Sequence, residues 1–374
     1  MKKHIVWILL VGITFTGLSQ NTPAYQDTIP FRNDLGLIII PITFNGVEKQ
    51  FAFDTGAQLT LAYGWAEEEG LKRTRKTLTI NSSSGLKSKM RYYKSGAINL
   101  ASRKINNHRI LNAPRNDIFS CHTIDGILGV DIIKAFNWTI DYANKILVMT
   151  PASYVPDKLE DMHELDFEFS NNRPSVFLNH KDNTFKFLLD TGAGGTSNIS
   201  KHNYTLTTID DYEQVQFQTG SFDVNGILTT SKPIVFQFPE TTSKDVSLSP
   251  IIYYNNKKST KIGNSLWREK QLFLSLKNDQ LYLSVPEIKQ NNKVYPCSLI
   301  FQDGAMRVVR IEEGSDIWNA GIRQGDTVSL FNGQAYEDFC SLDKAQRNLV
   351  KNSGTMELTF ANGKEFTVTR KQLF

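Results

Sequence analysis

Apolar and polar residues alternate over much of the chain, and short polar turns interrupt the alternation. Residues 38–53, IIIPITFNGVEKQFAF, read as two strands on either side of Asn45-Gly46, a dipeptide typical of tight hairpin turns. Residues 175–189, SVFLNHKDNTFKFLL, repeat this arrangement around a polar turn. In both places the second strand runs directly into the tetrapeptide Asp-Thr-Gly-Ala. The pattern predicts a mainly β chain in which two buried strands end at a carboxylate.

Two copies of one unit explain these similarities. Downstream of the hairpins, residues 127–149 and 261–283 align at nearly the same offset as the two tetrapeptides. Each reads as a short helix that leads into a hairpin with Asn in its turn. A chance match at both ends of a unit is improbable, so we infer an internal duplication. The predicted copies are residues 30–152 and 160–285.

The first residue of each tetrapeptide, Asp54 or Asp190, is the candidate for chemistry. A carboxylate at the end of a buried strand is costly unless its charge is shared or hydrogen-bonded. If the two copies pair face to face, the two aspartates meet at the axis between them, and carboxylates that close share one proton. The charged member then activates a water as general base, and the protonated member polarises a scissile carbonyl. We therefore predict Asp54 and Asp190 as catalytic residues.

The neighbouring residues suit such a pair of carboxylates. Glycine lets the backbone turn sharply and brings an N–H group close to the carboxylate. The threonine hydroxyls are short and can bond the backbone across a two-fold interface. The predicted supporting residues are Thr55, Gly56, Ala57, Thr191, Gly192 and Ala193.

These motifs resemble those of retropepsin-type aspartic proteases. The resemblance rests on Asp-Thr-Gly-Ala at 54–57 followed by GILGVDIIKAF at 126–136, which matches the family pattern in full. The second copy keeps Asp-Thr-Gly-Ala at 190–193, but its later element is KIG at 261–263, with Lys261 in an apolar position. Retropepsin homodimers contribute one aspartate from each chain, whereas this chain would contribute both, as a monomer.

The resemblance covers both copies. It implies two pseudo-symmetric retropepsin-like β-barrel halves and an aspartic endopeptidase that hydrolyses peptides or proteins without a cofactor. The family also implies flaps, which are hairpins that close over the substrate. Residues 81–96 and 217–230 lie where flaps are expected, with Ser84, Gly85 and Gly220 as candidate flap residues. The alternative is that both segments are ordinary glycine-bearing surface hairpins.

A non-catalytic interpretation also fits the sequence: a pseudoprotease or scaffold whose cleft binds peptides without cutting them. Loss of catalysis often removes one aspartate first. The intact second tetrapeptide therefore favours an active enzyme, while Lys261 favours the peptide-binding scaffold.

The last part of the chain, residues 291–374, has a different pattern. It reads as a strand, a helical turn, a strand, a helix over 343–350 and a hairpin, with AGIRQGD at 320–326. This order resembles a PDZ domain of the bacterial protease-associated form, a small α+β fold. PDZ domains add a peptide strand to a sheet edge and bind the peptide's C-terminal carboxylate in a loop that should be glycine-rich. Here that loop reads YPCSLIF (295–301), without glycine, so an interdomain packing module is the alternative to peptide binding. The polar residues 286–294 predict a linker before this domain.

The N-terminus, MKKHIVWILLVGITFTGLSQ, has two lysines, an apolar core and small residues at a cleavage-like spacing. This is the pattern of a secretory signal peptide, over residues 1–19. A retained membrane anchor is the alternative, although the apolar stretch is short for a span of about 20 residues. We expect an exported protein, periplasmic or extracellular, without a transmembrane span after cleavage.

Charge and cysteine usage add few constraints. The formal net charge is +4, and the isolated basic run LKRTRK at 71–76 is typical of a solvated face, so no nucleic-acid partner is predicted. Cys121, Cys297 and Cys340 lie far apart, and we expect all three to be small core or surface residues. At most Cys297 and Cys340 would pair, because both fall in the C-terminal region. The six histidines form no cluster, so no metal is expected.

Overall fold

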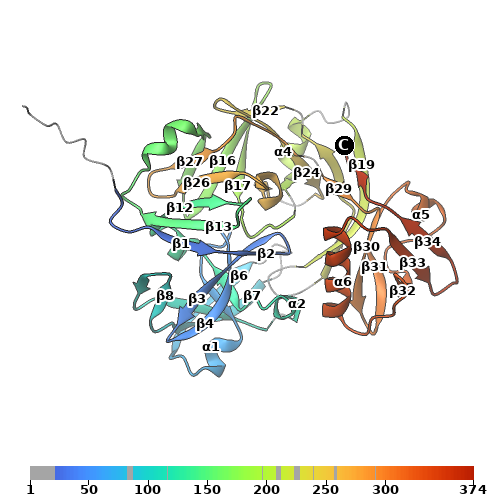
Figure 1. The fold of residues 1–374 in the computed structure, drawn as a ribbon, viewed down its shortest axis with the longest axis horizontal. Helices are drawn as coiled ribbons and strands as arrows, with labels where there is room; N and C mark the ends of the chain where they lie inside the picture. Colours follow the sequence, from blue (N-terminus) through green and yellow to red (C-terminus); the bar gives the residue numbers. More distant parts are fainter. Residues whose placement is uncertain are drawn as a thin grey trace, which may run out of the picture.

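The computed structural model describes residues 22–81, 87–115, 117–195, 197–207, 212–222, 228–238, 240–256, 259–290 and 292–374 (Figure 1). The predicted signal peptide at residues 1–19 and the candidate flap residues Ser84 and Gly85 lie outside these ranges. The fold is mainly β, as predicted. Within the described ranges no helix is both long and apolar enough to cross a membrane.

The first half of the molecule spans residues 27–151. Its elements are β1 (Asp27–Pro30), β2 (Arg32–Asp34), β3 (Leu37–Phe44), β4 (Val47–Phe53), β5 (Leu61–Tyr63), α1 (Trp65–Glu68), β6 (Arg73–Asn81), β7 (Lys87–Lys94), β8 (Ile98–Leu100), β9 (Arg103–Ile105), β10 (Arg109–Ala113), α2 (Asp117–Cys121), β11 (Gly126–Leu128), α3 (Val130–Ile133), β12 (Phe136–Asp141) and β13 (Ile146–Pro151).

The second half follows the same general order of elements. They are η1 (Asp157–Asp161), β14 (His163–Glu164), β15 (Phe167–Ser170), β16 (Arg173–His180), β17 (Asn183–Leu189), β18 (Ser197–Ile199), α4 (Lys201–Leu206), β19 (Gln214–Phe222), β20 (Leu228–Ser231), β21 (Ile234–Gln237), β22 (Thr241–Ser243), β23 (Val246–Ser249), β24 (Ile251–Tyr254), β25 (Lys261–Ile262), η3 (Asn264–Trp267), β26 (Gln271–Ser275), β27 (Gln280–Leu283) and β28 (Glu287–Lys289).

The two halves repeat the same strand pairings. The antiparallel hairpin β3–β4 corresponds to the hairpin β16–β17. The second strand of each hairpin, β4 or β17, pairs in parallel with a short later strand, β11 or β25. Likewise β5 pairs in parallel with β10, and β18 with β24. The halves are therefore pseudo-symmetric, as predicted.

Local sequence explains why the first hairpin forms where it does. Asn45 and Gly46 connect β3 to β4, and both have left-handed backbone angles, with φ of 49° and 91°. Glycine and asparagine adopt this conformation more readily than other residues, and two such residues in succession match the twist of a hairpin. Beyond this turn, β4 becomes fully buried over Phe51–Phe53, which brings the chain into the interior just before Asp54.

A six-stranded sheet joins the halves, in the order β1-β13-β12-β26-β27-β14. At its centre, β12 of the first half pairs antiparallel with β26 of the second half, with Trp138 opposite Leu274. One apolar core extends through both halves, and its fully buried side chains include Trp138 and Trp267. Loops from the two halves can therefore meet within one packed interior.

Residues 293–374, named here the C-terminal unit, have a hydrophobic core of their own. The unit lies to one side of both halves, in red and orange at the right of Figure 1. The predicted strand at 305–311, helix at 343–350 and final hairpin are all present. The elements are β29 (Lys293–Val294), β30 (Cys297–Gln302), β31 (Ala305–Glu312), α5 (Asp316–Asn319), β32 (Thr327–Phe331), α6 (Phe339–Lys351), β33 (Met356–Phe360), β34 (Glu365–Val368) and β35 (Lys371–Gln372).

A disulfide connects the C-terminal unit to the first half. It joins Cys121, the last residue of α2, to Cys340 in the first turn of α6, with a Cα–Cα distance of 5.3 Å. The sequence-based expectation for the cysteines is therefore wrong. Cys297, the other partner considered for Cys340, is a free cysteine buried in β30. The bond arises because α6 packs against α2, and nothing in the spacing of the cysteines shows that tertiary contact.

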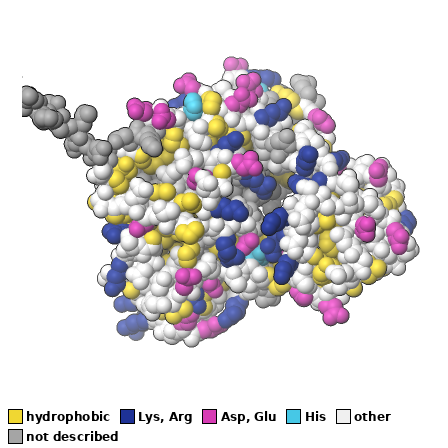
Figure 2. All heavy atoms as spheres, in the orientation of Figure 1, with side chains coloured by type: hydrophobic (Ala, Val, Ile, Leu, Met, Phe, Trp, Pro, Cys, Tyr) yellow, Lys and Arg dark blue, Asp and Glu magenta, His cyan; other side chains and the backbone are white. Residues whose placement is uncertain are grey.

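The C-terminal unit contacts the second half through backbone and apolar side chains. β31 pairs antiparallel with β19, with Phe217 opposite Glu312. Near the chain end, Leu373 packs in a small cluster with Phe217, Val235 and Ile251. In the space-filling view, Lys and Arg side chains gather along the junction between the unit and the two halves (Figure 2).

The prediction of a linker at 286–294 is wrong for its first part. Residues 287–289 form β28, which pairs in parallel with β23 of the second half. Gln290 is buried, and its side-chain oxygen accepts a hydrogen bond from the backbone N–H of Ile251 at 2.9 Å. Polar residues mislead here because Glu287 and Lys289 are exposed on either side of the buried Ile288, as in a strand with one face toward solvent. The second half therefore extends to about residue 290.

Candidate active site

Both predicted aspartates stand at the end of a buried strand, where the two halves meet. Asp54 follows β4, and its backbone N–H donates to the carbonyl oxygen of Leu128 at 3.0 Å. Asp190 follows β17, and its N–H donates to the carbonyl oxygen of Ile262 at 2.9 Å. The parallel partner strands β11 and β25 therefore hold the two loops in matching positions.

The two threonines bind the loops to each other, as predicted. The N–H of Thr55 donates to Oγ1 of Thr191 at 2.9 Å, and the N–H of Thr191 donates to Oγ1 of Thr55 at 3.0 Å. The Thr55 hydroxyl donates to the carbonyl of Leu189 at 2.5 Å, and the Thr191 hydroxyl to that of Phe53 at 2.8 Å. Each threonine is only 1% exposed, so water does not compete for these bonds. The result is a symmetric junction directly beneath the aspartates.

The glycines allow each carboxylate to lie against the opposite loop. A Cβ atom added to Gly56 would stand 2.4 Å from Oδ1 of Asp190, and one added to Gly192 would stand 2.2 Å from Oδ2 of Asp54. Neither position has room for a side chain. Asp54 and Asp190 are therefore brought together across the junction.

Burial and the nearby charge of Asp190 raise the pKa of Asp54 to about 7. Hydrogen bonds from the backbone and the ammonium of Lys261 act in the opposite direction and only partly offset this rise. Asp54 therefore keeps its proton through the mildly acidic range.

The two carboxylates have different hydrogen-bond partners. Oδ1 of Asp54 accepts the backbone N–H groups of Gly56 at 2.8 Å and Ala57 at 3.0 Å. Oδ2 of Asp190 instead accepts a hydrogen bond from the Nζ of Lys261 at 2.8 Å. Burial lowers the pKa of Lys261, but the charge of Asp190, the hydrogen bond to Asp190 and the charge of Asp54 together outweigh burial and leave that pKa raised. The site is thus symmetric in its backbone and asymmetric in its side chains.

The remaining supporting residues connect the loops to the short helices behind them. The carbonyl of Ala57 accepts the N–H of Val130 in α3, and the carbonyl of Ala193 accepts the N–H of Asn264 in η3, both at 2.8 Å. The Asn264 amide also donates to the carbonyl of Thr191 at 2.6 Å, while its oxygen accepts from Tyr142 at 2.9 Å.

Sequence reasoning missed Asn264 and Tyr142, and it noted Lys261 without finding the ion pair. Lys261 was within reach of the sequence, because the repeat aligns it with Ile127, next to the strand that carries the aspartate. The Asn264 and Tyr142 contacts depend on how the halves pack, which no local pattern shows.

The candidate flap hairpins lie only partly within the described residues. β6 pairs with β7 up to Asn81 and Lys87, and the tip with Ser84 and Gly85 lies outside the described residues. Gly220 lies inside β19, opposite Thr230 of β20. A Cβ added to Gly220 would stand 2.7 Å from the side chain of Val309, so this glycine permits close contact with the C-terminal unit.

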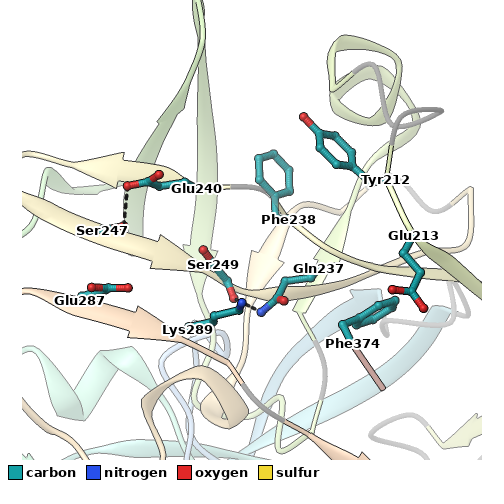
Figure 3. Close-up of a pocket in the computed structure, with 10 residues that line it drawn as sticks. All are labelled: Tyr212, Glu213, Gln237, Phe238, Glu240, Ser247, Ser249, Glu287, Lys289 and Phe374. Carbon is teal, nitrogen blue, oxygen red and sulfur yellow. Dashed lines mark hydrogen bonds between the residues drawn. The ribbon is translucent and has the colours of Figure 1, made fainter. Parts of the chain in front are cut away.

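A separate cavity of about 560 Å³ lies on the second half (Figure 3). Glu213, Glu240 and Glu287 line it, together with Lys289 and the C-terminal residue Phe374. None of the residues of the Asp-Thr-Gly loops contributes to it. Among the residues described, no group of three or more His, Cys, Asp or Glu side chains is arranged to hold a metal ion.

Comparison with known proteins gives a family match for part of the first half. Residues 40–132, which include the first aspartate loop, match the family described as aspartyl protease. Among solved structures, basic 7S globulin from soybean is similar, with a TM-score of 0.42 and 10% sequence identity over 70% of this chain and 95% of that chain. No curated protein matches the chain. The family match covers part of the first half, including the loop that carries Asp54.

Proposed function

We propose that the chain is an aspartic endopeptidase in which Asp54 and Asp190 activate one water molecule. The observation that carries this proposal is the junction between the halves. Each carboxylate lies against the glycine of the opposite loop, and burial with the charge of Asp190 keeps the pKa of Asp54 at about 7. One protonated and one ionised carboxyl group are what acid–base hydrolysis of a peptide bond needs. The threonine junction supplies the rigidity that such a pair requires.

In the proposed reaction the ionised carboxylate takes a proton from water while the water oxygen bonds to the scissile carbonyl carbon. The carbonyl oxygen receives the proton of the other carboxyl group, which gives a tetrahedral diol. On collapse, the first carboxyl group protonates the leaving nitrogen as the C–N bond breaks. The second carboxylate takes back a hydroxyl proton, so the pair returns to its initial state.

Substitution of either aspartate tests this proposal. Asp54→Asn and Asp190→Asn should each lower kcat/KM for a mixed peptide library by about 10²–10⁴-fold, because acid–base catalysis contributes that much. Asp303→Asn, at an exposed turn, is the matched control for the loss of one carboxylate. A statine-type inhibitor should block the wild-type protein. Near-normal turnover by Asp190→Asn would contradict the pair within one chain and favour one built from Asp54 of two chains.

A non-catalytic peptide-binding scaffold remains the second candidate, and one observation favours it. The ammonium of Lys261 contacts Asp190 directly, which leaves fewer free lone pairs on that carboxylate for water. A scaffold would bind the same peptide library without cleaving it, and its binding would survive Asp54→Asn. Mass spectrometry of the library after incubation with the wild-type protein distinguishes the two candidates.

We further propose that the C-terminal unit has a PDZ-like fold, supported by the order of its strands and helices. In such a fold a peptide would add to β30 beside α6. Here the Gln346 amide of α6 meets the backbone of Leu299 in β30, accepting its N–H at 2.8 Å and donating to its carbonyl at 3.0 Å. A peptide strand would have to displace Gln346. This supports a role in bracing the β19–β20 hairpin over a role in capturing peptide C-termini.

A shortened chain that ends after residue 290 tests whether the C-terminal unit braces the β19–β20 hairpin. If the unit only recruited substrates, the shortened chain would cleave short peptides normally and proteins poorly. The brace predicts an equal loss on both, because β19 loses its partner strand β31.

We also propose that the protein is exported. The disulfide between Cys121 and Cys340 supports this location, since such bonds persist in oxidising compartments and are rare in the cytosol. Cleavage of the N-terminal segment during secretion, read by N-terminal sequencing of the secreted protein, is the test.

A further inference from the structure

Lys261 lies at a position that is apolar in the first half. In β25 it stands opposite Leu188 of β17, just as Ile127 in β11 stands opposite Ala52 of β4. Ile127 is 7% exposed and belongs to an apolar cluster. The same backbone position therefore carries an aliphatic side chain beside one aspartate and an ammonium group beside the other.

The ammonium is held tightly against a single carboxylate. Lys261 Nζ is 2.8 Å from Oδ2 of Asp190, and the two side chains are only 18% and 11% exposed. Lysine is rarely buried without a partner, and shielding from water strengthens the attraction between such charges. Oδ1 of Asp190 is left on the side of Gly56, toward the opposite loop.

The two aspartates and Lys261 act on one another through their charges. Asp54 senses the charges of Asp190 and Lys261, and Lys261 senses those of Asp190 and Asp54. With one proton on Asp54, this group of three side chains is neutral. Loss of that proton would leave a net negative charge in a buried place, which is unfavourable. Moving the proton to Asp190 would leave the ammonium facing a neutral carboxyl group.

We propose that Lys261 is a positioning residue that gives the two aspartates fixed roles, with Asp190 as the base that takes the proton of water and Asp54 as the acid that protonates the scissile carbonyl. This inference rests on the proposed peptidase function. In a symmetric pair either aspartate could act as base or as acid, whereas Lys261 fixes one role for each. Lys261 acts through Asp190, so it forms no bond to substrate in this scheme.

Replacement of Lys261 by the residue of the other half is the direct test. Lys261→Ile restores the side chain found at position 127 and removes the charge. The charge of Lys261 lowers the pKa of Asp54, so removing it should raise that pKa. The alkaline limb of the profile of kcat/KM against pH, where Asp54 loses its proton, should therefore move to higher pH. Lys186→Met is the matched control, because Lys186 lies on β17 but pairs with Glu168 at 2.6 Å on the surface, and its profile should overlie that of the wild type.

Two results in this experiment would overturn the inference. An unchanged profile in Lys261→Ile would mean that the ion pair between Lys261 and Asp190 does not set the protonation of the two aspartates. A higher kcat/KM than the wild type at every pH would mean that Lys261 hinders the reaction instead of organising it. Lys261→Met, which keeps a flexible unbranched side chain, provides the same readout if the isoleucine variant does not fold.

Carbon-13 NMR of the aspartate carboxyl groups shows which aspartate carries the proton, and the measurement does not require the protein to cleave a peptide. In the wild-type protein, one buried carboxyl signal should titrate near pH 7 and should be missing from the spectrum of Asp54→Asn. If that signal were missing from Asp190→Asn instead, the assigned roles would be reversed and the inference wrong. If the wild-type protein cleaved no peptide while the Asp54 signal titrated as expected, the proposed peptidase function would fail but the proton assignment would stand.

Discussion

The loops around Asp54 and Asp190 have nearly the same backbone and different chemistry. Both end a hairpin, both are held by a parallel strand, and both share the threonine junction. The difference lies in one neighbouring position, which is Ile127 in the first half and Lys261 in the second. Backbone symmetry therefore builds the pair of carboxylates, and a single side chain can decide how the pair is protonated.

The C-terminal unit is also attached to the two halves in different ways. It is joined to the first half by the disulfide and by a 3.6 Å ion pair between Arg347 and Asp34. It is joined to the second half by the β19–β31 pairing and by the packing of Leu373. The attachment to the first half includes a covalent bond, and the attachment to the second half includes paired strands and apolar contact. The two attachments respond to different perturbations.

The largest effect on stability should come from removing the carboxyl group of Asp54 in the first half. The pKa of Asp54 is raised from 3.8 to about 7 on folding. A raised carboxyl pKa means that the folded state binds a proton which the unfolded state has already released between those values. Stability from this group is therefore full below about pH 4 and is lost as pH rises through 7. Asp54→Asn should thus equal the wild type near pH 4 and be more stable on the order of 4 kcal/mol at pH 8.

Urea unfolding at a series of pH values measures this difference. Asp303→Asn removes one exposed carboxylate and should follow the wild-type curve throughout. A constant difference between Asp54→Asn and the wild type at every pH would show that Asp54 does not titrate between pH 4 and 7. The asymmetry between the halves would then need another explanation.

The disulfide should have the next largest effect. Breaking it by Cys121→Ser or Cys340→Ser should lower the free energy of unfolding by about 2–4 kcal/mol, as is typical of native disulfides. The double variant should lose no more than either single variant, since all three lack the same bond. Hydrogen exchange should increase in α2 and α6 and stay unchanged in β19 and β31. Increased exchange in β19 would show that the attachment to the second half depends on the attachment to the first.

Local patterns in the sequence predict much of the fold. The first hairpin follows from Asn45-Gly46, and the helix expected at 343–350 is the main part of α6. Such elements depend on residues close in the chain, where alternation and turn chemistry are visible. The segment 286–294 shows the limit of this reasoning, because its polar residues suit both a linker and the strand β28.

The candidate site was predictable in its symmetric part only. Repetition places Asp54 and Asp190 on equivalent strands, and the two-fold relation then brings them together. The contact between Lys261 and Asp190 needs the parallel pairing of β25 with β17, which follows from the repeat only once the register is known. The bond between Cys121 and Cys340 depends on the docking of α6, for which the sequence holds no local signal.

The smallest effect, and the strictest test of symmetry, concerns the threonine junction. Thr55→Val and Thr191→Val each remove a hydroxyl that donates to one carbonyl and accepts one N–H across the interface. A buried N–H left without a partner costs about 1–3 kcal/mol, so each variant should lose that much by urea unfolding. The two losses should be equal, because the hydrogen bonds of the two threonines mirror each other, and Thr→Ser at either position should restore most of the stability. A clearly larger loss at Thr191 would mean that the second half relies more on the junction than the first, so that the asymmetry introduced by Lys261 would extend from the side chains into the backbone.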